Sequence, residues 1–170
     1  MSAAPNNATG GHHVYGPPGS DRTKGTVRDG DASCLVKLFR PEPLSPDVWA
    51  GIAAESTVVI SALAELETLI QLKAAWKAGD FTRPQWRRLE AQLAALRNQA
   101  PYEFRPLPGR IFQTALRQHR HSGDTHCRTL ERLHLAAMED LGIRRLMTHD
   151  QQQWKAAVAA GFEVVQPGRS

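Results

Sequence analysis

The last third of the sequence alternates helical periodicity with short apolar runs, and this alternation restricts the fold more than any other feature. Residues 128–141 carry a helical pattern that ends at Gly142. A strand is then predicted at 144–148, a helix at 151–160 and a strand at 162–165. Strands that are joined by a helix pair in parallel through right-handed crossovers. The sequence therefore predicts an α/β domain with a central, mainly parallel sheet flanked by helices.

The middle of the chain predicts a strand followed by a pair of helices. Residues 57–60 form a β-branched run, which is too short for a helix and suits a buried strand. Apolar residues at spacings of three and four then predict a helix that ends near Gly79, with a stripe that comprises Leu63, Leu66, Ile70 and Ala74. A second helix begins at Thr82, and its apolar face comprises Trp86, Leu89, Leu93 and Leu96. The two helices are expected to form a hairpin.

Two later segments complete the pattern. Prolines bound residues 102–107, so this segment can only be an edge strand or a loop. Residues 109–119 carry another helical pattern. Trp76 and Trp86 fall on helical stripes, which favours packing in a core or a dimer interface over stacking on nucleic-acid bases.

The length and composition of the chain fit one domain with a single core. Of the 170 residues 41% are hydrophobic, but residues 1–28 hold few large apolar side chains and are expected to form a flexible tail. The domain is therefore placed at residues 29–170. No apolar run reaches the roughly 18 residues of a membrane span. The two cysteines, Cys34 and Cys127, lie far apart. These features predict a cytoplasmic protein with free thiols and no membrane contact.

Acidic residues fall at the junctions between the predicted elements. Asp31 precedes the first apolar run, Glu65 and Glu67 begin the helix after the buried strand, Glu131 begins a later helix and Asp150 follows a strand. Parallel strands would gather such junctions at one edge of the sheet, where ligands bind in open α/β folds. Crowded carboxylates repel one another unless a cation neutralises them. Hard oxygen ligands of this kind suit Mg²⁺ or Mn²⁺.

Each acid taken alone also has a purely structural explanation. Glu67 and Glu131 lie near helix N-termini, where negative charge is stabilised by the helix dipole. Asp150 fits the N-cap of the final helix, and Asp31 follows Gly30 as a turn residue would. The positions become informative only as a set.

As a set, these positions resemble the PIN-domain family and, within it, toxins of the VapC type. Four short motifs occur in the family's order: Asp31-Ala32-Ser33 before an apolar run, Ser61 six residues ahead of Glu67, the segment Cys127–Ala137 around Glu131, and Leu146-Met147-Thr148-His149-Asp150. None of them is specific alone, but four in the right order are much stronger. The resemblance covers about residues 29 to 167.

The resemblance implies a PIN-like three-layer fold and a metal-dependent ribonuclease that uses Mg²⁺ or Mn²⁺ to cleave RNA phosphodiester bonds. The implied catalytic acids are Asp31, Glu67, Glu131 and Asp150. Asp31, Glu131 and Asp150 are expected to bind the metal, and Glu67 is expected to orient the attacking water. The family's toxins also imply an RNA substrate, a cognate antitoxin in a toxin–antitoxin pair, and a homodimer.

Residues around the acids are expected to assist them. Ser33 and Thr148 would support the acids by hydrogen bonds. An acidic cleft repels RNA, so cations at its rim must supply the attraction, and Arg128 and Arg132 are the candidates. The basic run ahead of them comprises Arg117, His119, Arg120 and His121. The formal net charge of +4 favours a polyanionic partner without requiring one.

Three departures from the family pattern leave alternatives open. Glu131 stands where the family has Asp, and His149 replaces an aromatic or polar residue. The segment 26–30 is a poor first strand, so Asp29 competes with Asp31 as the first acid. One alternative is a catalytically degenerate PIN domain that binds RNA or a protein. Another is a helical interaction protein in which every acid is a helix cap, and then the acids would lie scattered.

Overall fold

The computed structural model describes residues 27–30, 32–39 and 45–166. Most of the predicted tail, residues 1–26, and the predicted first acid Asp31 lie outside the described residues. Within this part of the chain, no helix is both long enough and apolar enough to cross a membrane.

Five strands form one sheet in which every pair of neighbours is parallel, in the order β3-β2-β1-β4-β5. The strands are β1 (Val27–Gly30), β2 (Thr57–Ser61), β3 (Tyr102–Arg105), β4 (Arg145–Met147) and β5 (Glu163–Val165). β3 lies at one edge of the sheet, as the flanking prolines require. The predicted α/β fold with a central parallel sheet is confirmed.

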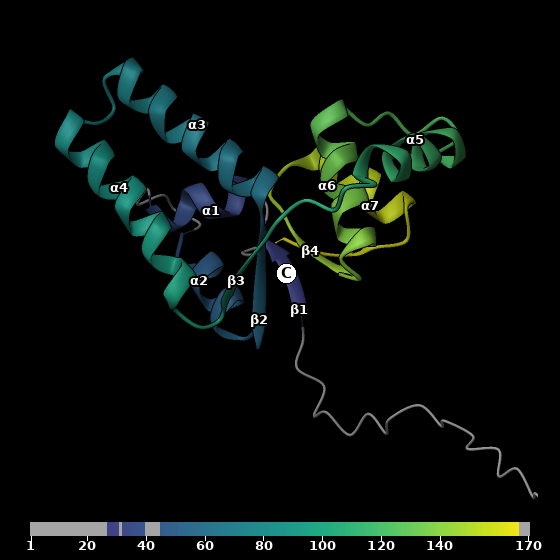
Figure 1. Ribbon diagram of the computed structural model, residues 1–170, viewed down its shortest axis with the longest axis horizontal. Coiled ribbons are helices and arrows are strands. Elements are labelled where there is room, and N and C mark those ends of the chain that lie inside the picture. The colour runs from purple at the N-terminus through teal and green to yellow at the C-terminus, as the bar shows by residue number, and fades with distance from the viewer. Residues whose placement is uncertain (1–26, 31, 40–44, 167–170) are drawn as a thin grey trace, which may run out of the picture.

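Helices cover both faces of this sheet (Figure 1). They are α1 (Ala32–Phe39), α2 (Ser45–Ala53), α3 (Ala62–Ala78), α4 (Arg83–Ala95), the short 3₁₀ helix η1 (Leu96–Asn98), α5 (Ile111–His121), α6 (Thr129–Asp140) and α7 (Gln151–Ala159). Figure 1 shows α1–α4 on one side of the sheet and α5–α7 on the other. The result is the expected three-layer arrangement.

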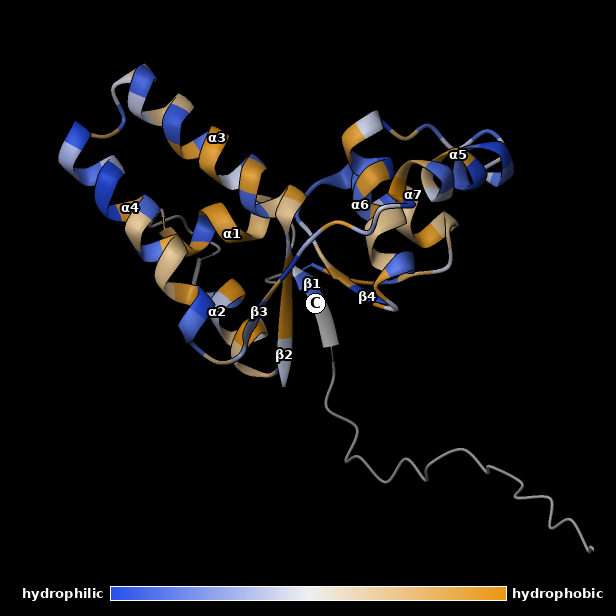
Figure 2. Ribbon diagram, viewed as in Figure 1, coloured by the Kyte–Doolittle hydropathy of each residue, from blue (hydrophilic) through white to orange (hydrophobic). Residues whose placement is uncertain are grey.

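The side chains of β2 explain why both faces need a helical layer. Val58 and Ile60 point to one side of the sheet. Val58 packs with residues of α1 and α2, and Ile60 packs with residues of α1 and α3. Val59 points to the opposite side and packs with α6 and α7. Figure 2 shows this central strand as largely apolar. A strand buried on both faces carries apolar residues at consecutive positions, which is the pattern that the sequence displays.

The weak first strand of the sequence is nevertheless central in the sheet. β1 pairs with β2 on one side and with β4 on the other. Asp29 and Gly30 in this strand are buried. Hydrogen bonds to two neighbouring strands compensate for the low strand propensity of the segment, because tertiary context outweighs such preferences.

Helices α3 and α4 form the predicted hairpin. The rings of Trp76 and Trp86 stack with their centroids 4.3 Å apart and their planes 2° from parallel. α3 ends at Gly79 in the left-handed conformation (φ 91°), and Thr82 begins α4 with a capping box to Gln85. The packing interpretation of both tryptophans is confirmed.

The apolar stripe predicted on α3 is confirmed at Leu63 and wrong at Leu66, Ile70 and Ala74. Leu66 and Ile70 are 54% and 56% exposed, whereas the buried face of α3 comprises Leu63, Ala64, Thr68, Leu72 and Ala75. α3 carries apolar residues on two faces, so periodicity cannot select between them. Small residues such as Ala64 and Thr68 let the neighbouring helix approach closely, and this shape decides which face is buried.

Candidate active site

A cleft of about 350 Å³ lies where the starts of α1, α3, α6 and α7 meet at the carboxyl edge of the sheet. It is lined by Ala32, Ser33, Glu67, Gln71, Arg128, Thr129, Leu130, Glu131, His134, Asp150 and Gln153. Three of the four predicted acids, Glu67, Glu131 and Asp150, therefore line one cleft. Asp29 lies within β1 and does not line it.

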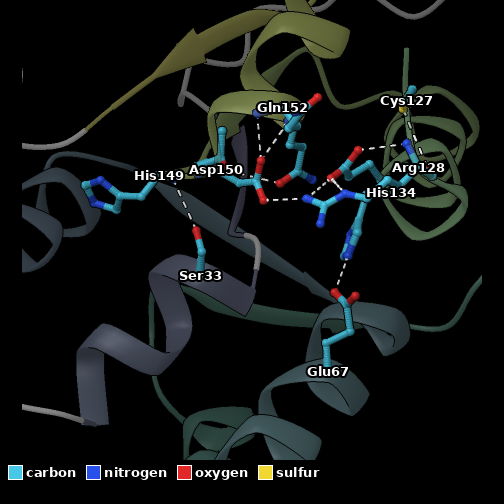
Figure 3. A network of polar contacts seen from close by, with 11 residues as sticks. Ser33, Glu67, Cys127, Arg128, His134, His149, Asp150 and Gln152 are labelled. Atoms are coloured by element: carbon cyan, nitrogen blue, oxygen red, sulfur yellow. Dashed lines mark hydrogen bonds and ion pairs between the residues drawn. The ribbon is translucent and has the colours of Figure 1, made fainter.

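Glu67 is placed by the start of α3. The Ser61 hydroxyl caps this helix by accepting a hydrogen bond from the Ala64 N–H at 3.2 Å. Six residues further along, the Glu67 carboxylate reaches into the cleft and its Oε2 lies 2.5 Å from Nε2 of His134. The His134 side chain is only 4% exposed. The contact holds the Glu67 carboxylate in one orientation (Figure 3).

Asp150 serves as a helix cap and as a cleft residue at the same time. Its Oδ1 accepts hydrogen bonds from the N–H groups of Gln152 at 2.7 Å and Gln153 at 3.0 Å, at the start of α7. Its Oδ2 accepts a hydrogen bond from Nη2 of Arg128 at 2.9 Å. The structural and the functional explanation of this residue are therefore compatible, because each uses a different oxygen.

Glu131 is buried at the start of α6, with its side chain 9% exposed. Its Oε2 accepts a hydrogen bond from the backbone N–H of Arg128 at 2.9 Å, which is the return contact of a capping box. Its Oε1 accepts a hydrogen bond from Nε of Arg128 at 2.5 Å. The extra methylene relative to Asp lets the carboxylate reach back to the residue that precedes the helix.

The guanidinium of Arg128 bridges two of the acids (Figure 3). Its Nη2 contacts both Oε1 of Glu131 and Oδ2 of Asp150. The hydrogen bond and charge of Glu131, followed by the charge of Asp150, raise the pKa of Arg128 above its ordinary value. The negative charge of the cleft is thus partly neutralised by a cation of the same chain.

Two carboxylates of the cleft are of the donor type that hard divalent cations prefer. Glu131 and Asp150 already share one cation, the Arg128 guanidinium, and both supply carboxylate oxygens. Among the described residues, no group of three or more His, Cys, Asp or Glu side chains could hold a metal ion. The fourth predicted acid, Asp31, precedes Ala32 of the cleft lining and lies outside the described residues.

Ser33 and Thr148 both contact the loop that carries Asp150. The buried Thr148 hydroxyl accepts a hydrogen bond from the Asp150 N–H at 3.0 Å and donates to Oε1 of Gln153 at 3.1 Å. The Ser33 hydroxyl accepts a hydrogen bond from the His149 N–H at 3.2 Å. The half-buried His149 ring points away from Asp150 (Figure 3). These contacts tie α1, the β4–α7 loop and the start of α7 together.

The positions of two further residues of this region differ from what the sequence predicted. Arg132, predicted to bind RNA, does not line this cleft and instead lines two other cavities. His134 lines the cleft and contacts Glu67, although sequence reasoning did not select it. Its position three residues after Glu131 places both on neighbouring positions of one helix surface, and this spacing could have identified it.

Comparison with known proteins gives consistent findings. Residues 31–159 match the PIN domain family. A structure of Mycobacterium tuberculosis VapC20, a sarcin–ricin loop cleaving toxin, is similar with a TM-score of 0.62 at 18% identity, covering 82% of this chain and 99% of that one. FitAB bound to a DNA fragment has a TM-score of 0.66 at 14% identity, covering 84% of this chain and 96% of that one. VapBC2 from Rickettsia felis, bound to a DNA fragment from its promoter, has a TM-score of 0.61 at 8% identity, covering 83% of this chain and 98% of that one.

Identities this low establish a shared fold and leave function to the site itself. No curated protein sequence matches the chain. The family match spans most of the chain and includes the described acids that line the cleft. The chain therefore belongs to the PIN domain family.

Proposed function

We propose that the chain is a metal-dependent ribonuclease that cleaves RNA phosphodiester bonds, and that it is the toxin of a toxin–antitoxin pair. The observation that carries the proposal is the cleft in which Glu67, Glu131 and Asp150 come together from the starts of three helices. If these acids served only as independent helix caps, nothing would require them to share one cleft, since they are far apart in sequence. The similarity to VapC20, a toxin that cleaves the sarcin–ricin loop, supports RNA as the substrate.

Asp31, Glu131 and Asp150 would hold Mg²⁺ or Mn²⁺, which supplies positive charge for the scissile phosphate and lowers the pKa of the attacking water. Glu67 would orient that water. Its Oε2 contacts His134, and its other carboxylate oxygen accepts no hydrogen bond from a described residue. His134 thus acts as a positioning residue, because it fixes the plane of the carboxylate.

Arg128 is the proposed phosphate ligand of this cleft. Its side chain is 59% exposed, so it can turn from the acids towards a phosphate at little cost in burial. A planar guanidinium forms paired hydrogen bonds with a phosphate as readily as with a carboxylate. The same residue would therefore neutralise the empty cleft and contact the RNA strand in the filled one.

The proposed partners are a cognate antitoxin and a second copy of the chain. VapBC2 and FitAB, both similar in fold, bind DNA fragments in their structures. An arginine from an antitoxin could pair with the cleft carboxylates in the way that Arg128 does here. Such a contact would compete with metal and silence the site.

One observation favours a second candidate, a degenerate PIN domain that binds RNA or a protein without cleavage. Both carboxylate oxygens of Glu131 are held by Arg128, one through its backbone N–H and one through its side chain. If these contacts persist when RNA binds, they compete with a metal ion for the lone pairs of Glu131 and weaken it as a metal ligand.

The test is cleavage of a panel of structured RNAs, including a sarcin–ricin hairpin, with Mg²⁺ or Mn²⁺ and with a chelator. We expect Asp150→Asn and Glu67→Gln to lower the cleavage rate by about 100-fold or more, since removal of an essential charged group costs several kcal/mol. Asn keeps the helix cap of Asp150, so this variant separates catalysis from folding.

Asp47→Asn, which removes an exposed carboxylate from α2, is the matched control and should cleave like the wild type. Equal cleavage by wild type and Asp150→Asn would contradict the proposal. Binding of RNA by a wild type that cleaves nothing in the panel would favour the degenerate domain.

A further inference from the structure

A second cavity lies away from the carboxylate cleft, among α5, α6 and α7. It has a volume of about 400 Å³ and is lined on its polar side by Arg117, His121, Ser122, Thr125 and Arg132. Figure 1 shows these three helices together on one side of the sheet. None of the predicted catalytic acids lines this cavity.

Arg132 is the unusual residue of the cavity. It is only 7% exposed, and its Nε is buried with no hydrogen-bond partner. No carboxylate among the described residues forms an ion pair with it. A buried arginine Nε that donates to nothing is unfavourable, because burial removes the hydration of this N–H and no described group replaces it. The arrangement therefore points to an anion that completes it.

The one carboxylate among the described lining residues does not serve as that counter-ion. Glu139 accepts hydrogen bonds from Nη2 of Arg117 at 2.6 Å and from Nε2 of Gln118 at 2.8 Å. Arg117 is thus neutralised by Glu139, whereas the charge of Arg132 is left over. With two arginines and one glutamate, the cavity carries an excess of positive charge.

We propose that this cavity binds a phosphate group, with Arg132 as its main ligand. The planar guanidinium presents paired N–H donors, which match phosphate oxygens. Thr125, a lining residue, adds a hydroxyl that can donate. The Ser122 hydroxyl already donates to the carbonyl oxygen of His119 at 2.8 Å. The site is therefore built around one buried arginine and a neutral donor.

The phosphate could belong to a free ion or to the backbone of an RNA strand, and the second source rests on the proposed function. Arg132 directly follows Glu131 in α6. Successive helical positions point about 100° apart, so one faces the cleft and the other faces the cavity. A strand whose scissile bond lies at Glu131 could place a neighbouring phosphate around the start of α6.

The first experiment uses inorganic phosphate as the probe and thermal unfolding of the full chain as the readout. Phosphate, compared with chloride at equal ionic strength and without divalent metal, should raise the Tm of the wild type by about 3 °C. Arg132→Met should show no such rise. Arg132→Lys, which keeps the charge but loses the planar fork, should show a smaller one.

Arg88→Met is the matched control, because Arg88 is an exposed arginine of α4 that lines neither cavity. It should retain the full rise. Met has a similar length and removes an uncompensated buried charge, so Arg132→Met is expected to fold. No rise in the wild type, or an equal rise in Arg132→Met, would overturn the proposal.

The second experiment measures binding of a labelled single-stranded oligoribonucleotide without divalent metal, over a range of salt concentrations. Loss of one phosphate contact should reduce the slope of log K against log salt by about 0.7 in Arg132→Met, with no change in Arg88→Met. An unchanged slope together with a phosphate-dependent Tm would assign the cavity to a free phosphate and exclude the RNA strand. Since neither readout requires cleavage, the outcome is separate from that of the nuclease test.

Discussion

At the scale of single residues, Arg128 has the largest consequence for the candidate site. Its backbone N–H and its side chain hold Glu131, and its guanidinium also contacts Asp150. A metal ion that uses the same two carboxylates must compete with this guanidinium, because both cations are attracted to the same oxygens. In the proposed nuclease, Arg128 would thereby link metal affinity to RNA affinity within one side chain.

Replacement of Arg128 by Ala should change these two affinities in opposite directions. Mn²⁺ binding should become about three-fold tighter, a modest gain because the guanidinium that competes with the metal is exposed to solvent. RNA binding should weaken, because one phosphate contact is lost. Titration with Mn²⁺ followed by electron paramagnetic resonance, and RNA binding without metal, measure the two effects.

Arg88→Ala is the control for the loss of one positive charge from the surface. It should leave Mn²⁺ affinity unchanged. If Arg128→Ala binds Mn²⁺ no more tightly than Arg88→Ala does, Arg128 and the metal do not compete for the same carboxylates.

At the scale of elements, polar contacts brace α5 against α6. Glu139 of α6 accepts hydrogen bonds from Arg117 and Gln118 of α5, and Asp140 accepts them from Arg110 and Thr114. The hydrogen bond from Gln118, followed by that from Arg117, lowers the pKa of Glu139 below its ordinary value. The contacts are thus stronger for the ionised than for the protonated carboxyl.

The lowered pKa of Glu139 predicts a pH-dependent contribution to stability. The contribution is complete above the ordinary pKa of about 4.5 and is lost as the pH falls through the lowered value. Glu139→Gln should therefore be less stable than the wild type by about 0.5 kcal/mol at neutral pH, a small effect because the carboxylate is partly exposed. The difference should shrink towards zero in acid.

Urea unfolding of both proteins across this pH range measures the effect. Glu90→Gln on α4, whose contact with Arg87 at 3.7 Å is longer, is the comparison variant and should show a smaller difference. If the stability difference between the wild type and Glu139→Gln stays constant into acid, the difference does not come from the charge of Glu139.

At the scale of the whole molecule, α3 leaves apolar side chains uncovered. Leu66 and Ile70 lie four residues apart on one helix surface, and each is more than half exposed. Apolar residues that gather on a surface in this way are typical of protein interfaces. They support the proposed homodimer, in which α3 would meet a second copy of the chain.

Ile70→Glu should therefore lower the association constant of the dimer by at least about ten-fold, because a charge placed in an apolar interface loses its hydration. Sedimentation equilibrium of the wild type and the variant measures it. Val158→Glu, a comparable change at an exposed residue of α7, should leave the association constant unchanged. A monomeric wild type, or equal effects of the two substitutions, would exclude α3 as the dimer surface.

Much of the architecture was predictable, because periodicity and helix boundaries are local properties of a sequence. The final helix–strand alternation and the hairpin of α3 and α4 were predicted, and the segment of β3 was expected to be an edge strand or a loop. The positions of Glu67, Glu131 and Asp150 at junctions between elements also predicted that they would line one cleft. Parallel strands bring their carboxyl ends together at one edge of the sheet.

The order of the elements, and the edge of the sheet at which the acids gather, thus follow from local patterns in the amino-acid sequence. The buried face of α3, the bridge that Arg128 forms between Glu131 and Asp150, and the position of Arg132 outside the carboxylate cleft became visible only in the folded molecule. These features depend on shape and on contacts between residues that are distant in sequence. Helical spacing gives the direction of a side chain on its own helix, but the partner that it meets is set by how the helices pack.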